Sequence, residues 1–510
     1  MKMFKKAQIQ QGVISDFDIA ESALIRPNEI RALFALFTFY WLAYSTGEIA
    51  LLQLMNIVGP VILTFILCWS CFRIARASHA AIWAPLFWFR LACAAYFGVG
   101  ALVVHIANAE TINRIYTLFY FDDEINFKVN LIYISGIFVS LSMSHFLLIF
   151  LKKMYRKNKF QSGLSSGDST VYFGWAYLIF GGFVRYTIAI PYELGLINYV
   201  IPGIVITISN VFYAGVYLLA RASVSTKKSY KLIVFSIVIV DIIVSVTSFS
   251  KAQLVFILIF YFLGIISNFA TKKFIFGGSL AVFIAYSTFG PLVTYGRDEI
   301  SFRYGEIRGA GISERMAIVS RWITENRDVS DRDSQQSFNR VNYLSVNAFA
   351  VERYDSGKPG DTFKHAAAVF VPRFLWPGKP IISDLGAELN ELVFGRDTSQ
   401  LGVGHFAEAY WNFGWKGIVP MMAVLAFILT VYSRFSIGVM ARKDWLFLPL
   451  VLLGVTIGFR VDGHFVVVTL GPAWTAMIIA IPLSAVSGIA LAVTSRRRNT
   501  NADVQARVPR

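Results

Sequence analysis

Long apolar stretches alternate with short polar segments along most of the chain. A helix needs about 20 residues to cross the roughly 30 Å hydrocarbon core of a bilayer. Stretches of suitable length predict about twelve membrane-spanning helices. They cover residues 32–48, 50–72, 80–106, 129–151, 171–190, 197–220, 231–249, 252–271, 274–295, 417–433, 445–460 and 464–493. The pattern therefore predicts an all-α, polytopic membrane protein.

The loops between these predicted helices differ in their content of Lys and Arg. One set of alternate loops carries basic clusters near residues 2–6, 26–31, 73–76, 152–159, 221–231, 272–273, 434–443 and 496–498. The short loops of the other set contain only Arg114, Lys128, Lys251 and Arg460. Because an excess of Lys and Arg marks cytoplasmic loops, we expect both termini in the cytoplasm and residues 296–416 outside it.

These boundaries divide the chain into five expected segments. They are a cytoplasmic N-terminal segment (1–31), a bundle of about nine helices (32–295), an extracytoplasmic loop (296–416), a bundle of about three helices (417–493) and a basic cytoplasmic tail (494–510). The basic N-terminus is followed by no apolar run until about Leu33, so we expect no cleavable signal sequence.

Composition supports the membrane assignment and excludes another class. Of the 510 residues, 56% are hydrophobic and 15% are charged, which is typical of a multi-span membrane protein. The net charge of +16 follows from the basic loops, so it does not indicate a nucleic-acid partner. Cys68, Cys71 and Cys93 all lie in apolar stretches, where they are expected to pack rather than to form disulfides.

One polar, aromatic segment, residues 369–417, interrupts the membrane pattern. Its proline-broken sequence is unsuited to crossing a bilayer. The apolar run from Phe363 to Trp376 is too short to span and ends before Pro377, which predicts a re-entrant or interfacial helix. A membrane protein that keeps such a segment is expected to use it for binding or chemistry.

Charged residues also lie inside or beside the predicted helices, where they are expensive. Arg90 falls near the middle of one predicted helix, and Asp241 of another is its candidate ion-pair partner. Several cations are expected at the extracytoplasmic face: Arg185, Lys251, Arg297, Arg303, Arg373, Lys379 and Arg460, the last in a turn with Asp462 and His464. Two anionic ligands fit them, phospholipid headgroups and a lipid-linked diphosphate, whose oxygens suit multidentate Arg.

Within 369–417, Glu408 is the candidate general base for an acceptor hydroxyl, and a helix cap or salt bridge is its structural alternative. His405 is a competing base because an imidazole titrates near neutral pH. The candidate sugar-binding residues are Trp376, Tyr410, Trp411 and Asn412, although an interfacial aromatic belt would also explain the rings. Asp331 and Asp333 imitate a metal motif in a polar, turn-rich stretch, so no metal site is predicted.

The segments P-R-F-L-W-P-G-K-P (372–380), Thr398 and G-H-F-A-E-A-Y-W-N-F-G-W-K-G (404–417), with the layout of spans around one large loop, resemble the Wzy-type O-antigen and exopolysaccharide repeat-unit polymerases. The resemblance implies a GT-C-like glycosyltransferase of the bacterial cytoplasmic membrane. It also implies undecaprenyl-diphosphate-linked oligosaccharides as donor and acceptor, no cofactor or metal, and a chain-length regulator as a candidate protein partner. Glu408, His405 and Arg373 would then be catalytic, and Arg373 would also hold the diphosphate together with the other cations.

Two alternatives stay open. An O-antigen ligase of the same fold would fit composition and charge equally well, although the F-L-W-P-G-K-P and N-F-G elements favour a polymerase. A flippase for lipid-linked sugars usually contains repeated halves and no large external loop, so the single loop at 296–416 disfavours it.

Overall fold

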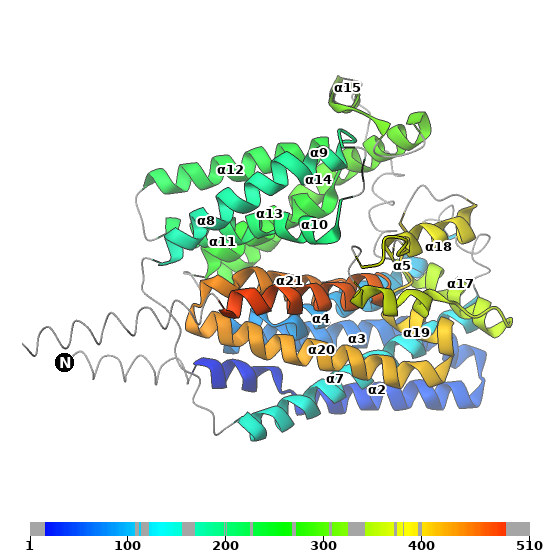
Figure 1. Cartoon of the computed structure of the whole chain (residues 1–510). Coiled ribbons are helices and arrows are strands. Elements are labelled where there is room, and N and C mark those ends of the chain that lie inside the picture. The colour runs from blue at the N-terminus through cyan, green and yellow to red at the C-terminus, as the bar shows by residue number, and fades with distance from the viewer. Residues whose placement is uncertain are drawn as a thin grey trace, which may run out of the picture.

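The computed structural model describes residues 16–107, 112–113, 122–155, 169–197, 199, 201–224, 228–267, 272–304, 309–324, 342–371, 375–380, 382–395 and 400–485. Every regular element within these ranges is a helix (Figure 1). The prediction of an all-α membrane protein is therefore confirmed at this level. Seven helices are long and apolar enough to cross a membrane: Ile49–Ala77, Pro85–Ile106, Asp123–Met154, Ser169–Glu193, Gly203–Ser223, Trp415–Arg442 and Val466–Ala485.

The helices form two groups, which lie one above the other in Figure 1. The first bundle contains α2 (Pro27–Thr46), α3 (Ile49–Ala77), α4 (Pro85–Cys93), α5 (Gly100–Ile106), α7 (Asp123–Tyr155), α20 (Trp415–Arg442), α21 (Leu448–Phe459) and the last helix (Val466–Ala485). The second bundle contains α8 (Ser169–Val184), α9 (Ile190–Glu193), α10 (Gly203–Ser209), α11 (Val211–Ser223), α12 (Lys228–Thr247), α13 (Lys251–Ile266) and α14 (Lys272–Tyr304).

Sequence chemistry explains where several helices begin and end. Pro27 and Pro85 occupy the first turns of α2 and α4, where a missing N–H leaves no broken bond. Gly47 adopts φ 65°, a left-handed conformation that ends α2 and separates it from α3. The predicted helices 32–48 and 50–72 are therefore two distinct elements.

The two bundles meet through aromatic side chains. The ring of Trp83 packs edge-on against Tyr217 of α11, with centroids 4.7 Å apart. The indole Nε1 of Trp445 donates to Thr170 Oγ1 of α8 (2.9 Å), and the Tyr177 hydroxyl donates to the Trp445 carbonyl (3.0 Å). These contacts join the bundles near the N-terminal end of α8.

The two ends of the molecule differ in their elements. The C-terminal ends of α3, α7 and α20 lie together at one end, which brings together the basic clusters near Arg76, Lys152 and Arg442 (Figure 1). The opposite end carries four helices from the predicted large loop (Figure 1). They are α15 (Ile312–Thr324), α17 (Leu344–Asp355), α18 (Leu385–Phe394) and α19 (His405–Phe413), and we call this the α19 end.

Two sequence expectations need correction or refinement. Arg90 does not pair with Asp241: its Nε lies 2.9 Å from Glu29 Oε1 of α2. Arg90 and Asp241 belong to different bundles. The position of a residue along its own predicted helix does not show which other helices lie beside it. The run from Phe363 to Trp376 begins with two short 3₁₀ helices, Thr362–His365 and Ala367–Phe370, rather than one continuous interfacial helix.

Candidate functional site

Two glycines delimit α19, the short helix that carries five of the candidate residues: His405, Glu408, Tyr410, Trp411 and Asn412. Gly404 (φ 75°, ψ 151°) precedes the helix, and Gly414 (φ 62°, ψ −154°) separates it from α20. Residues with a Cβ avoid both conformations. At Gly417 a Cβ would lie 2.6 Å from the Ala409 carbonyl oxygen, so α20 approaches α19 closely there. The glycine spacing of the 404–417 motif thus has a backbone cause.

Phe406 fixes α19 against the first bundle. Its ring is fully buried, and its centroid lies 5.0 Å from that of Phe97 and 6.4 Å from that of Tyr133. A Cβ at Gly136 of α7 would lie 2.3 Å from the Phe406 ring. This packing turns the neighbouring His405 and Glu408 side chains into the protein rather than toward water.

The Glu408 carboxylate joins α19 to the start of the last helix. Glu408 Oε1 lies 3.1 Å from His464 Nδ1, and Oε2 accepts a hydrogen bond from the backbone N–H of Phe465 (2.6 Å). The side chain of Thr362 is a further hydrogen-bond partner. An anion at the first N–H groups of a helix is stabilised by the helix dipole. Glu408 therefore caps the last helix and orients the His464 ring at the same time.

His405 uses both of its ring nitrogens within the protein. Its Nδ1 lies 3.2 Å from the Gly463 carbonyl oxygen, and its Nε2 lies 2.9 Å from Thr469 Oγ1. A carbonyl oxygen only accepts, so we assign the proton to Nδ1 and let Nε2 accept from the threonine hydroxyl. His405 is fully buried in this neutral form.

The ionisation tendencies of the three groups diverge for physical reasons. Burial and the loss of hydration lower the pKa of His405 to about 4. Burial raises the pKa of Glu408, but hydrogen bonding to His464 and Phe465 outweighs it and leaves that pKa below its ordinary value. Burial lowers the pKa of His464, whereas the Glu408 carboxylate raises it more, with a smaller contribution from the Leu401 carbonyl. Of His405, Glu408 and His464, only His464 has its pKa shifted upward from the ordinary histidine value. It is therefore the group of the three that is suited to exchange a proton near neutral pH.

The second ring nitrogen of His464 has a different status from the first. His464 is 3% exposed, and its Nε2 makes no hydrogen bond of standard geometry with any residue that the structure describes, although the Leu401 carbonyl is close enough to stabilise the charged ring. With the Nδ1 proton directed at Glu408, Nε2 of the neutral ring carries a lone pair. A carboxylate–imidazole pair with one unused nitrogen can take a proton from a hydroxyl group.

The predicted sugar-binding residues have mixed environments. Tyr410 is buried and its hydroxyl donates to Asp355 Oδ1 (2.8 Å), while the Lys128 ammonium lies 5.2 Å from its ring centroid. Trp411 is buried against Gly360. Asn412 Nδ2 donates to Thr362 Oγ1 (2.9 Å) and to the Glu408 carbonyl (2.8 Å). These three side chains connect α19 to neighbouring residues, whereas Trp376 is 43% exposed.

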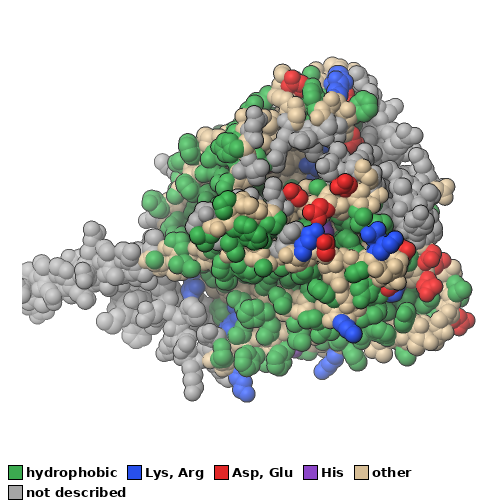
Figure 2. All heavy atoms as spheres, turned by 45° about the vertical axis from the view of Figure 1, so that its right-hand side comes forward, with side chains coloured by type: hydrophobic (Ala, Val, Ile, Leu, Met, Phe, Trp, Pro, Cys, Tyr) green, Lys and Arg blue, Asp and Glu red, His purple; other side chains and the backbone are tan. Residues whose placement is uncertain are grey.

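Arg460 and Lys379 both have partners within the protein. Arg460, which is 46% exposed, lies 3.5 Å from Asp462 in the turn before His464. Lys379 Nζ donates to the Val371 carbonyl (2.9 Å). Arg373 and Thr398 lie outside the described residues. Figure 2, which brings the α19 end forward, shows acidic and basic side chains gathered there among apolar surfaces.

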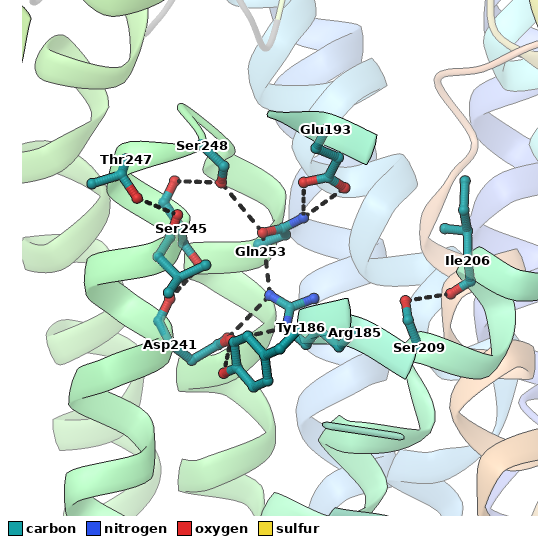
Figure 3. Close-up of polar contacts among 11 residues, drawn as sticks. Arg185, Tyr186, Glu193, Ile206, Ser209, Asp241, Ser245, Thr247, Ser248 and Gln253 are labelled. Atoms are coloured by element: carbon teal, nitrogen blue, oxygen red, sulfur yellow. Dashed lines mark hydrogen bonds and ion pairs between the residues drawn. The ribbon is translucent and has the colours of Figure 1, made fainter. Parts of the chain in front are cut away.

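The other four predicted cations belong to the second bundle. Arg185 Nε donates to Asp241 Oδ1 (2.9 Å) and Nη2 to Gln253 Oε1 (3.1 Å), and the Tyr186 hydroxyl also donates to Asp241 (Figure 3). The remaining three also have protein partners: Lys251 with Thr294 (2.6 Å), Arg297 with the Phe249 carbonyl (2.7 Å) and Arg303 with Glu299. The predicted cations are thus divided between the two bundles.

No family model, curated protein or solved structure matches this chain. Among the described residues, no group of three or more His, Cys, Asp or Glu could hold a metal ion.

Sequence reasoning placed His464 only among the cations of a turn. The only sequence signal for its role is the position of a histidine directly before an apolar helix, and that position does not name Glu408 as its partner.

Proposed function

We propose that this chain is a membrane glycosyltransferase that joins undecaprenyl-diphosphate-linked oligosaccharide repeat units into a polysaccharide. Within the proposal, about twelve spans form a GT-C-like arrangement in the bacterial cytoplasmic membrane. Both termini are cytoplasmic, and the α19 end faces outward. The resemblance of residues 372–380 and 404–417 to Wzy-type polymerases supports it, and the buried pair that Glu408 of this motif forms with His464 is the observation that carries it.

His464 is the proposed general base. Its Nε2 takes the proton of an acceptor sugar hydroxyl, and the sugar oxygen attacks the anomeric carbon of the donor. The bond from that carbon to the diphosphate oxygen breaks, so undecaprenyl diphosphate leaves with the electron pair. Glu408 acts as a positioning residue, because its carboxylate holds the ring and stabilises the imidazolium that forms. We assign this role to His464 rather than to His405, because both nitrogens of His405 have protein partners and its pKa is lowered to about 4.

The departing diphosphate gains negative charge as its bond breaks, and cations held near it lower the barrier. Lys379 and Arg460 are the proposed contacts beside the dyad, with Arg373 in the same motif. Arg185 is already neutralised by Asp241, so we give it a structural role unless the substrate displaces that carboxylate. Lys251, Arg297 and Arg303 would reach the diphosphate only if it extends toward the second bundle.

The test is a reconstitution with matched substitutions. The purified chain in lipid vesicles receives lipid-linked repeat units isolated from its source bacterium, and the lengths of the glycan products are measured. His464→Gln should lower kcat by about 10²–10⁴-fold, the usual contribution of general acid–base catalysis. Glu408→Gln should lower kcat with little change in KM, because Gln still accepts from Phe465 N–H. His79→Gln, an exposed histidine at the opposite end, is the control and should leave the rate unchanged.

The outcomes separate the competing functions. Wild-type chain that forms no polymer, but transfers a finished glycan to a lipid A core, would replace the polymerase proposal with the ligase. Movement of lipid-linked sugar across the vesicle without a new glycosidic bond would replace it with the flippase. Normal polymer from His464→Gln would keep the polymerase and reject the base assignment.

A further inference from the structure

The helix α15 lies at the α19 end, beyond the end of α12 and alongside the C-terminal part of α14 (Figure 1), and contacts both. It lies near the start of the predicted extracytoplasmic loop (296–416). Its 13 residues run I-S-E-R-M-A-I-V-S-R-W-I-T. Its placement and its three distinct faces allow an inference that does not depend on the proposed enzymatic activity.

Arg315 fixes α15 to the ends of two helices. Its side chain is fully buried, and its Nη1 and Nη2 donate to the carbonyls of Thr247 (3.5 Å) and Glu193 (3.4 Å). Its Nε donates to the Ala310 carbonyl (3.0 Å). Thr247 and Glu193 are the last residues of α12 and α9, where the helix dipole favours a cation. Arg315 therefore holds α15 at the level where these two helices end.

The position of Arg315 also fixes the rotation of α15 about its own axis. Successive residues of a helix turn by about 100°, so Arg315, Ile318 and Trp322 share one face. Ile318 is buried, and the Trp322 ring lies 5.2 Å from that of Tyr295 in α14. This face is the one packed on the second bundle.

A second face is apolar and exposed. Ile312, Met316 and Ile323 fall within about 40° of one another on a helical projection. Their exposed fractions are 50%, 51% and 66%. On the opposite side of the projection lie Glu314 and Arg321, about 170° away from this stripe. Apolar and charged side chains also lie side by side at the top of Figure 2, where α15 is found.

The level of α15 identifies what covers the apolar stripe. The span Ser169–Glu193 ends at one of the two carbonyls that Arg315 contacts. On α12, the exposed side chains of Val240 and Ile243 continue the apolar outer surface to within one turn of Thr247. A helix at the end of membrane spans, with one apolar and one charged face, has the geometry of a helix lying in the acyl–headgroup boundary.

We infer that α15 is an interfacial helix whose Ile312–Met316–Ile323 stripe is covered by bilayer lipid. Glu314 faces the aqueous side, Arg321 pairs with Glu299 of α14 (3.3 Å), and Arg315 anchors the helix laterally to the second bundle. Lipid is the occupant, rather than a second protein, because the stripe lies at the height where the exposed apolar surface of α12 ends.

Spin labels can test this orientation in the full chain. Cys68, Cys71 and Cys93 are first replaced by alanine, and single labels are then placed by Met316→Cys and Glu314→Cys. The labelled chains are reconstituted in phosphatidylethanolamine–phosphatidylglycerol vesicles, and collision rates with oxygen and with a water-soluble nickel chelate are measured. A label introduced by Ile243→Cys on α12 is the lipid reference. The Met316→Cys label should match this reference, with a ratio of oxygen to nickel accessibility several-fold above that of Glu314→Cys.

Two results would overturn the inference. If the nickel chelate reaches the Met316→Cys and Glu314→Cys labels equally, the stripe faces water. If the Met316→Cys label is shielded from both reagents, a protein surface covers it. The unmodified chain provides a second measurement that needs no cysteine replacement. Irradiation in vesicles that contain a lipid with a diazirine near the carboxyl end of its acyl chain should attach lipid to the peptide bearing residues 312–323. That peptide left unmodified while α12 is labelled would reject lipid contact.

Discussion

Arg185–Asp241 in the second bundle and Glu408–His464 in the first are both buried acid–base pairs, but they leave different groups available. Around Arg185, the carboxylate accepts from the guanidinium and from Tyr186, while Gln253 links Arg185 to Glu193 (Figure 3). Both oxygens of the Glu408 carboxylate have hydrogen-bond partners. Nε2 of its partner His464, however, has no hydrogen-bond partner among the described residues. A saturated network favours rigidity, whereas an unused lone pair permits proton transfer.

The two pairs also differ in the groups that ionise. A guanidinium keeps its proton at every physiological pH, whereas an imidazole gains or loses one near neutrality. A buried Arg–carboxylate pair can hold helices together, but it cannot exchange a proton with a substrate. The Arg185–Asp241 and Glu408–His464 pairs are both buried, so burial does not distinguish them as candidate sites. They differ because one contains an arginine and the other a histidine.

The largest expected effect tests the structural role of the second-bundle pair. Asp241→Ala leaves the Arg185 guanidinium buried beside no carboxylate from α12, and breaking one partner of a buried pair costs about 3–5 kcal/mol of unfolding free energy. Arg185→Met combined with Asp241→Leu removes both charges and should recover most of that loss. Unfolding of the chain in lipid bicelles would measure both variants. A single substitution that leaves stability unchanged would show that the pair does not hold the bundle.

A second effect concerns acid, and it should be confined to the α19 site. The pKa of His405 is lowered to about 4 in the folded chain, against 6.5 when unfolded. As pH falls from 6.5 to 4, His405 binds a proton in the unfolded chain but stays neutral in the folded chain. The unfolding free energy therefore decreases. The separation of these values corresponds to about 3 kcal/mol, all of it lost by pH 4. His405→Gln should remove this decrease, as measured by unfolding at several pH values.

Glu408 and His464 change the unfolding free energy mostly outside the interval from pH 4 to 6.5. Glu408, whose folded pKa is lowered, contributes stability above 4.5 that is lost as pH falls through its folded pKa. His464, whose folded pKa is raised, contributes stability below 6.5 that is lost as pH rises through its folded pKa. His79→Gln is the matched control and should keep the wild-type slope. If Arg185→Met with Asp241→Leu removes the slope instead, acid sensitivity would belong to the second bundle and the comparison would fail.

The sequence predicted the parts of this molecule that depend on local pattern. Apolar length predicted the helices, and the polar break at 369–417 located the segment that contains α19. The sequence pattern did not predict which side chains from distant helices contact one another. Hydropathy gives the depth of Arg90 in its helix but not the neighbour of that helix, so Asp241 was chosen where Glu29 is the partner.

The same limit applies to the site. Glu408 and His405 were recognised because they stand in one short motif, while His464 lies 56 positions from Glu408 and meets it only through tertiary packing. Arg315 was missed because its partners are backbone carbonyls. Every residue has a backbone carbonyl, so the sequence does not identify which ones contact an arginine. The buried positions of Tyr410 and Trp411 were likewise not visible in a pattern rich in aromatic residues.

The smallest expected effect compares the same chemical change in the two bundles. Tyr186→Phe removes a hydroxyl that donates to the fully buried Asp241 (2.9 Å), and Tyr410→Phe removes one that donates to Asp355 (2.8 Å), whose side chain is 38% exposed. A hydrogen bond to a buried charged group contributes about 1.5–3 kcal/mol, so Tyr186→Phe should destabilise the chain by about that amount. Water can replace the lost donor at Asp355, and Lys128 still pairs with it (2.5 Å), so Tyr410→Phe should cost less than about 1 kcal/mol. Unfolding free energies of the two variants measured side by side decide the matter, and equal losses would mean that the saturated network around Arg185 is no more rigid than the periphery of the α19 site.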